Sequence, residues 1–242
     1  MSDSNHPSIE RIPHHGENVM FKLTYKLYQP WSTFVMHIPA PPPIIESMIK
    51  ITDKILREKE NEDGYSIPLD MLVQEGASSF FLNMTSEYVK LADKQALKAP
   101  QGNIISTLES IKVVLQKDHE HKPLHSQSGL IRPGATVLNL SAIMYLKIPE
   151  YLPSRNPTRN EDGAITFINN CGRDNRWANP SITFQPEVGD LFIFSGSLEH
   201  LVYPFRTPDG KGERRSVSFN AEFACKSEQD FLKKQLKNQE TI

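Results

Sequence analysis

The last third of the chain carries residues whose types and spacing could hold a metal ion beside a dicarboxylate. The apolar run at residues 191–194 leads to a turn with His200, and a second strand-like run opens with Arg214, Arg215 and Ser216. Because side chains alternate along a strand, Arg214 and Ser216 share one face while Arg215 points the other way. Imidazoles are common metal ligands, and the planar fork of arginine meets a carboxylate with two charge-assisted hydrogen bonds. The pattern could therefore hold a metal ion next to a dicarboxylate.

A second candidate segment lies upstream, where His125 is followed by Gln127 and later by a strand-like run containing Tyr145. A mononuclear iron site with open positions needs two imidazoles and one carboxylate. His119 and His121 are an alternative source of a ligand, although a charged cluster before a proline is more often an exposed polar turn. The Tyr145 hydroxyl could bind a co-substrate, but a strand tyrosine is more often a core residue with a hydrated hydroxyl.

Two helices are expected to precede these motifs. Apolar residues recur at helical spacing over residues 44–59 and again over residues 79–98, with charged residues opposite in the first segment. The segment 104–114 could be helix or strand, and its β-branched pair Val113-Val114 favours strand at the end. We expect the first helix to lie with its apolar face on a sheet.

The rest of the chain has the pattern of a β protein. Strand-like runs occur at residues 21–25 and 33–36, and short apolar runs separated by Gly, Pro and Asn continue at 137–138, 141–148, 164–168, 182–184, 191–194 and 216–223. Many short strands with turn signals are typical of a β-sandwich or barrel. Helices that come before the strands predict a β core with helical cover on one side.

Composition limits the classes of function. The 242 residues are 38% hydrophobic and carry a net charge of −2, which provides no bulk field to recruit nucleic acid or an anionic membrane. No apolar run approaches the ~20 residues that span a bilayer, and two cysteines favour free thiols in a reducing cytoplasm. We expect a flexible arm at 1–18, one domain at 19–226 with helical cover at about 44–98 and a β core at about 112–225, and a tail at 227–242 that contains a short surface helix.

Over roughly residues 120–221, the order of the motifs resembles the 2-oxoglutarate/Fe(II)-dependent oxygenases, most of all the small members found in bacteria and tailed phages. In that family a loop with two metal ligands, two positions apart, leads into a strand of the type Leu-Ser-Gly-Val-x-Tyr-Leu. Residues 140–146 are similar to this strand, and residues 163–167 are similar to the Gly-x-Ile-x-Phe strand that follows it. His200 and the motif Arg214-x-Ser216 then stand in the expected order.

The resemblance implies a double-stranded β-helix, or jelly roll, with the N-terminal helices packed on one sheet. It implies Fe(II) held by His125 and His200, with Gln127 at the third position, and no catalytic residue beyond the metal ligands. Arg214 and Ser216 would bind the distal carboxylate of 2-oxoglutarate, with Tyr145 beside them. The activity so implied is hydroxylation of an unactivated C–H bond in an unknown substrate by an Fe(II)/2-oxoglutarate-dependent dioxygenase.

Gln127 leaves two alternatives open, because a neutral amide is a poor iron ligand beside a carboxylate or an imidazole. The site either keeps two histidines with an amide or water as third ligand, or has lost its metal. In the second case the chain is an inactive jelly-roll binding or structural protein, such as a phage-type assembly component. We expect no membrane or nucleic-acid partner and a cytoplasmic location, or a virion for a phage protein. The sequence does not indicate the oligomeric state.

Overall fold

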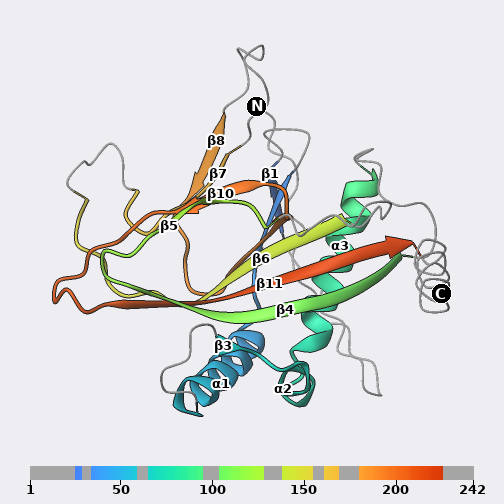
Figure 1. The fold of residues 1–242 in the computed structure, drawn as a ribbon, viewed down its shortest axis with the longest axis horizontal. Helices are drawn as coiled ribbons and strands as arrows, with labels where there is room; N and C mark the ends of the chain where they lie inside the picture. Colours follow the sequence, from blue (N-terminus) through green and yellow to red (C-terminus); the bar gives the residue numbers. More distant parts are fainter. Residues whose placement is uncertain are drawn as a thin grey trace, which may run out of the picture.

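A computed structural model of the chain describes residues 25–28, 34–58, 65–94, 104–127, 138–154, 161–168 and 180–225. These residues form two antiparallel sheets (Figure 1). The large sheet has the strand order β1-β2-β9-β6-β11-β4-β3, and the small sheet has the order β5-β10-β7-β8. The strands of the large sheet are β1 Lys26–Tyr28, β2 Val35–Pro39, β3 Tyr65–Ser66, β4 Ile104–Lys117, β6 Leu138–Lys147, β9 Asp190–Ser195 and β11 Glu213–Cys225. Those of the small sheet are β5 Lys122–His125, β7 Ile165–Ile168, β8 Ser181–Phe184 and β10 Glu199–Val202.

Three helices cover the outer face of the large sheet, namely α1 Pro42–Glu58, α2 Leu69–Gln74 and α3 Ser78–Lys94. In α1, the buried residues Ile44, Met48, Ile51 and Ile55 recur every three or four positions, so they form one stripe on the helix. This stripe belongs to the same apolar cluster as Val217 and other residues on the outer face of β11. Burying each such side chain contributes about 1.5–3 kcal/mol, so the helical cover is a major part of the stability of the fold.

A second apolar cluster fills the space between the two sheets. Half of its buried residues are aromatic, and Phe167 of the small sheet meets Phe194 of the large sheet edge to face with ring centroids 4.8 Å apart. Tyr145 and Phe192 belong to the same cluster. The large sheet is therefore covered on both faces, and several polar side chains of its inner face, such as Arg214, Ser216 and Ser141, are buried.

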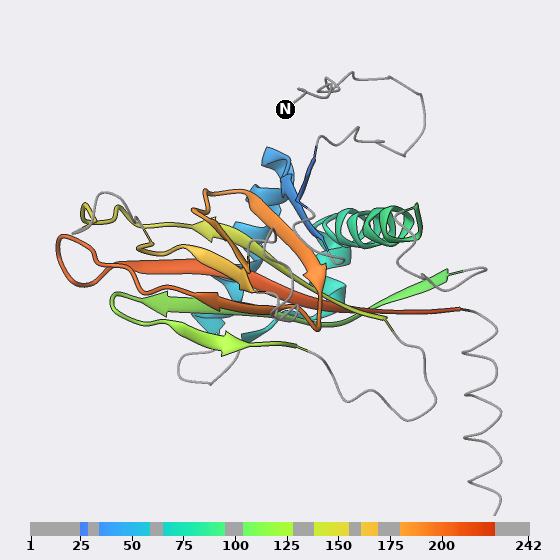
Figure 2. The ribbon, with the colours of Figure 1, turned by 90° about the horizontal axis from the view of Figure 1, so that it is seen from above.

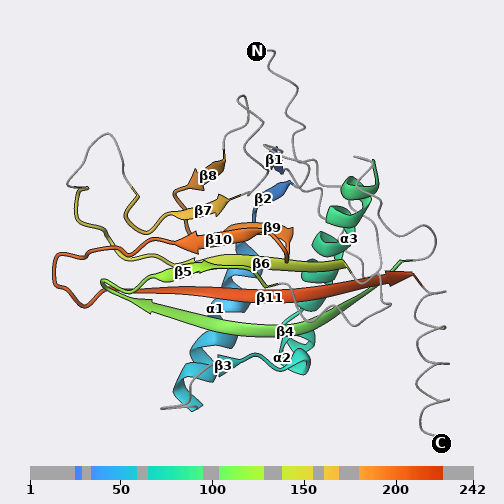
Figure 3. The ribbon, with the colours of Figure 1, turned by 45° about the horizontal axis from the view of Figure 1, so that its top comes forward.

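Strand β11 runs between β6 and β4 along the longest axis of the molecule (Figures 2 and 3). Val217 and Phe219 are buried in the cluster below the helices, so the alternation of side chains directs Arg215 to the helices and Arg214 and Ser216 to the inner face. Local strand geometry thus separates the two adjacent arginines.

The fold expected from the sequence is confirmed, with two facing antiparallel sheets and helices on one of them. The helices expected at 44–59 and 79–98 are α1 and α3, and the ambiguous segment after residue 104 is the long strand β4. His200 lies inside the short strand β10 rather than in a turn, because this segment pairs with both β5 and β7. Helix α2 and strands β3 and β5 were not anticipated.

Other expectations lie outside the described residues. These are the arm at 1–18, the strand run at 21–24 and the tail at 227–242. The single-domain extent of 19–226 stays a prediction. In the part of the chain that the structure describes, no helix is long and apolar enough to cross a membrane.

Candidate metal and co-substrate site

His125 and His200 are neighbours across the small sheet. His125 ends β5, His200 lies in β10, and the two residues are direct partners in the register of these antiparallel strands. Their ring centroids are 4.2 Å apart with the ring planes inclined by 51°. A metal–nitrogen bond is about 2.0–2.1 Å and the centroid of a ligating ring lies farther from the ion, so two rings this close can share one ion when both Nε2 atoms face it.

Backbone carbonyls determine which nitrogen of each ring carries the proton. Nδ1 of His125 lies 2.7 Å from the carbonyl oxygen of Pro123, and Nδ1 of His200 lies 3.0 Å from that of Leu198. A carbonyl can only accept, so Nδ1–H donates in both rings and Nε2 keeps its lone pair in the neutral state. Metal-binding histidines usually make this kind of contact through the nitrogen that does not bind the metal.

His200 is held in its neutral form. It is 5% exposed, and Phe194 meets the ring edge to face with centroids 4.8 Å apart. Burial lowers the pKa of His200 to about 4, the hydrogen bond to Leu198 opposes this shift, and the nearby His125 adds to it. At neutral pH the imidazole is therefore ready to bind a cation without losing a proton first.

Gln127 follows β5 and contacts the inner face of the large sheet. Its Oε1 lies 2.5 Å from Oγ of Ser141, which is buried in β6. Its backbone N–H donates to the carbonyl of Gly196, at 2.8 Å. Among the described residues, no group of three His, Cys, Asp or Glu side chains could hold a metal ion, so no described carboxylate completes a metal site with the two histidines.

The alternative ligands upstream are engaged or exposed. His119 has a side chain that is 75% exposed, and its Nε2 lies 3.0 Å from Oδ1 of Asp118. His121 is exposed as well. Neither histidine has a ring contact with His125 or His200 among those found in the described structure.

Arg214 is a buried cation without a carboxylate partner among the described residues. It is 2% exposed, and its guanidinium donates from Nη1 to the carbonyl of Gly163 and from Nη2 to Oε1 of Gln116. Both acceptors are neutral. An uncompensated buried charge is costly, so this environment favours binding of an anion.

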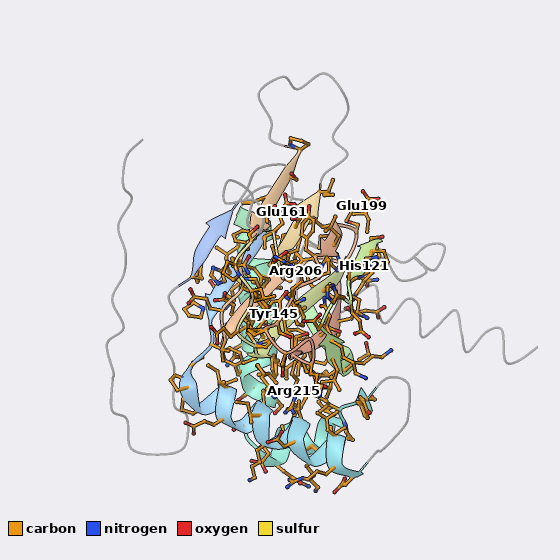
Figure 4. All side chains as sticks on the ribbon, turned by 90° about the vertical axis from the view of Figure 1, so that its left-hand side faces the viewer. His121, Tyr145, Glu161, Glu199, Arg206 and Arg215 are labelled. Carbon is orange, nitrogen blue, oxygen red and sulfur yellow. The ribbon has the colours of Figure 1, made fainter. Side chains whose placement is uncertain are left out.

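Aromatic residues surround the Arg214 guanidinium. Its central carbon lies 5.3 Å from the ring centroid of Tyr145 and 5.5 Å from that of Phe205, within the range of cation–π attraction. Figure 4 shows Tyr145 amid the sheets and Arg215 nearer α1, where its Nη1 donates to Oδ1 of Asp53 at 2.5 Å. The two arginines therefore have different surroundings.

The buried Tyr145 hydroxyl near Arg214 lacks a hydrogen-bond partner among the described residues, whereas a side-chain hydrogen bond with Arg214 is one of the influences that lower the pKa of Tyr151. Burial raises the pKa of Tyr145 to about 12 and raises the pKa of Tyr151, and the positive charge of Arg214 opposes both shifts. Ser216, buried on the face of β11 that carries Arg214, pairs in register with Tyr145. Together these groups offer a cation and three hydroxyls to a bound carboxylate.

Sequence reasoning missed two residues that hold Arg214. Gln116 of β4 stands opposite Arg214 in the strand register, and its Nε2 donates to the carbonyls of Glu120 and Tyr203, which turns Oε1 toward the guanidinium. Gly163 has φ +72°, and a Cβ there would lie 2.6 Å from the Tyr151 ring. The sequence motif contained this glycine, but nothing in the sequence pointed to Gln116.

A family comparison covers part of the segment that carries these residues. Residues 134–220 match the sequence profile of a family described as putative 2OG-Fe(II) oxygenase. The matched segment contains His200, Arg214 and Ser216, whereas His125 and Gln127 precede it. The resemblance to the 2-oxoglutarate/Fe(II)-dependent oxygenase family is thus confirmed over this segment, and Fe(II) and 2-oxoglutarate are the metal and co-substrate of that family. A search among curated proteins found no match.

Comparison with solved structures gives the fold. EvdO2 from Micromonospora carbonacea var. aurantiaca, complexed with 2-oxoglutarate, has a TM-score of 0.50 at 13% identity, with 80% of this chain and 87% of that chain covered. A Pseudomonas putida prolyl-4-hydroxylase has a TM-score of 0.47 at 17% identity, with coverage of 78% and 89%. A 2OG-Fe(II) oxygenase family protein from Burkholderia pseudomallei has a TM-score of 0.36 at 12% identity, and the match covers 53% of this chain and only 50% of that protein. The first of these likenesses supports the double-stranded β-helix.

The chemistry of the two histidines fits a divalent transition metal, and the chemistry of the groups around Arg214 fits a carboxylate. His125 and His200 each present an unprotonated Nε2, and the Tyr145 hydroxyl is a buried polar atom without a partner among the described residues. Imidazole ligands suit iron. The histidine pair and the surroundings of Arg214 are therefore compatible with Fe(II) and 2-oxoglutarate, which the family uses. Position 127 is the exception, because it carries an amide.

Proposed function

We propose that the protein is an Fe(II)/2-oxoglutarate-dependent dioxygenase that hydroxylates an unactivated C–H bond. The observation that carries the proposal is the pairing of His125 with His200, at a ring-centroid separation of 4.2 Å, in a fold whose other sheet holds a buried, uncompensated Arg214. In the overall reaction, 2-oxoglutarate, dioxygen and R–H give succinate, carbon dioxide and R–OH. Bound Fe(II) would supply the redox chemistry of this conversion.

The residues of the chain would bind, orient and enclose the reactants. His125 and His200 would hold the metal through Nε2, with the side-chain oxygen of Gln127 as third ligand. Arg214 would bind the distal carboxylate of 2-oxoglutarate, assisted by the hydroxyls of Tyr145 and Ser216. The apolar cluster between the sheets would exclude bulk water, which strengthens these charge interactions.

Anaerobic titration tests the proposal without knowledge of the substrate. Adding Fe(II) and 2-oxoglutarate together should give the weak visible charge-transfer band of the chelate, and His200→Ala should abolish it. A wild-type protein that gives no band and binds no metal would contradict the proposal.

One observation favours a second function. The described residues include no carboxylate placed with the two histidines, which is the arrangement expected after loss of metal binding. We propose as the alternative a jelly-roll binding or structural protein, such as a phage-type assembly component. Under this alternative, the wild-type protein and His200→Ala would have the same weak affinity for Fe(II).

A further inference from the structure

Three polar side chains stand in one row across the inner face of the large sheet, on three neighbouring strands. Ser110 of β4 pairs in register with Asn220 of β11, and Asn220 pairs with Ser141 of β6. Oγ of Ser141 is 2.9 Å from Oδ1 of Asn220, and the Asn220 amide is 3.5 Å from Oγ of Ser110. Because Ser141 also contacts Oε1 of Gln127, four polar groups are linked.

This row lies at the level of the histidine pair. In β9 the register partner of Ser141 is Phe194, and the Phe194 ring packs against the His200 ring. The loop that carries Gln127 is tied to the same level through Gly196, whose carbonyl accepts from the Gln127 backbone and whose N–H donates to the Asn139 carbonyl. Gln127, the last of the four linked polar groups, is therefore directed toward the candidate metal site.

The single hydroxyl proton of Ser141 limits the directions of the hydrogen bonds in this row. The Ser141 hydroxyl has one proton, so it cannot donate both to Gln127 and to Asn220. Its contact with Oε1 of Gln127 is the shorter, at 2.5 Å, and its contact with the Asn220 amide is 2.9 Å. When Ser141 donates to Oε1 of Gln127, the Asn220 amide must present its nitrogen to Ser141, because one hydroxyl proton cannot serve both contacts.

In this arrangement the two shorter links run in one direction, from Asn220 through Ser141 to Gln127. The contact between the Asn220 amide and Oγ of Ser110 is 3.5 Å, at the limit for a hydrogen bond, so Ser110 adds little. Hydrogen bonds that run in one direction polarise one another. We propose that this chain is a positioning device, in which Ser141 holds the oxygen rather than the nitrogen of the Gln127 amide ready to bind the metal ion, so that an amide replaces the usual carboxylate ligand. This inference rests on the proposed metal site.

A double-mutant cycle tests whether Ser141 acts through Gln127. Co(II), an air-stable probe, is titrated into wild type, Ser141→Ala, Gln127→Leu and the double variant, with affinity measured by calorimetry and visible absorption. Loss of a group that orients a metal ligand typically costs 10–100-fold in affinity. Ser141→Ala should therefore bind Co(II) 10–100-fold more weakly than wild type, and it should cost nothing further once Gln127 is leucine.

Matched variants separate this role from a purely structural one. In the described structure, the hydroxyl of Ser195 in the adjacent strand β9 contacts only Ser197. The control variant Ser195→Ala should therefore bind Co(II) with wild-type affinity. Ser141→Thr retains the hydroxyl and should bind Co(II) as wild type does, while the equally large Ser141→Val should bind it as weakly as Ser141→Ala. If Ser141→Ala fails to fold, the comparison of Thr with Val still tests the positioning role.

The outcomes distinguish the positioning role of Ser141 from the proposed metal-dependent function. If His200→Ala abolishes Co(II) binding but Ser141→Ala binds normally, or loses affinity equally in the Gln127→Leu background, the positioning role is wrong and the metal site stands. If the wild-type protein binds no Co(II), both the inference and the proposed function are wrong.

Discussion

Replacing Arg214 should abolish tight binding of 2-oxoglutarate, whereas replacing its neighbour Arg215 should not. Arg214 is 2% exposed and contacts only neutral acceptors among the described residues, so an incoming carboxylate would meet an uncompensated, largely dry cation. Arg215 points to α1 and pairs with Asp53, whose side chain is 49% exposed. The two residues form a matched pair because they are adjacent and chemically identical.

The magnitudes follow from burial. Truncating one partner of a buried, hydrogen-bonded charge pair costs about 2–5 kcal/mol, so Arg214→Ala should weaken 2-oxoglutarate binding by about 30-fold to several thousand-fold. Arg214→Lys keeps the charge but loses the planar fork, and should fall between this variant and wild type. Arg215→Ala removes a partly exposed ion pair worth about 1 kcal/mol or less of stability, and should bind 2-oxoglutarate as wild type does.

Calorimetric titration of 2-oxoglutarate into Co(II)-loaded protein measures these affinities. Thermal unfolding must accompany it, because Arg214→Ala also leaves the Gly163 carbonyl and the Gln116 amide oxygen without a donor, at about 1–3 kcal/mol each. Equal losses of affinity at the two arginines, or a larger loss at Arg215, would show that Arg214 does not bind the co-substrate.

Three further changes have definite expected results. Gln127→Asp should tighten Fe(II) binding in an anaerobic titration, because a carboxylate adds negative charge at the third position; unchanged affinity would mean that residue 127 does not reach the metal. Gly163→Ala should lower the free energy of unfolding by at least about 1–3 kcal/mol, because φ is +72° and its Cβ would strike the Tyr151 ring; a stability equal to wild type in urea unfolding would contradict this. Phe81→Ala should cost about 3–5 kcal/mol, because the buried ring packs edge to face on Phe219 at 5.0 Å, and a loss below 1 kcal/mol would show that α3 does not depend on this contact.

The sequence by itself determined the features that depend on local geometry. The stripe of Ile44, Met48 and Ile51 predicts α1 because helical periodicity is a property of neighbouring residues. The separation of Arg214 from Arg215 follows from the alternation of side chains along a strand in the same way. The order of the motifs along residues 120–221 also indicated the family without any knowledge of contacts.

Only the tertiary structure decided which distant residues complete the site. Gln116 lies 98 positions from Arg214 along the chain and becomes its partner through the register of β4 and β11. Ser141 meets Asn220 and Gln127 because strand register and the loop after β5 bring them to one level. Strand register is set by packing across the whole sheet rather than by local residue preference, so the sequence could place each of these side chains on a strand face or in a loop but could not pair them.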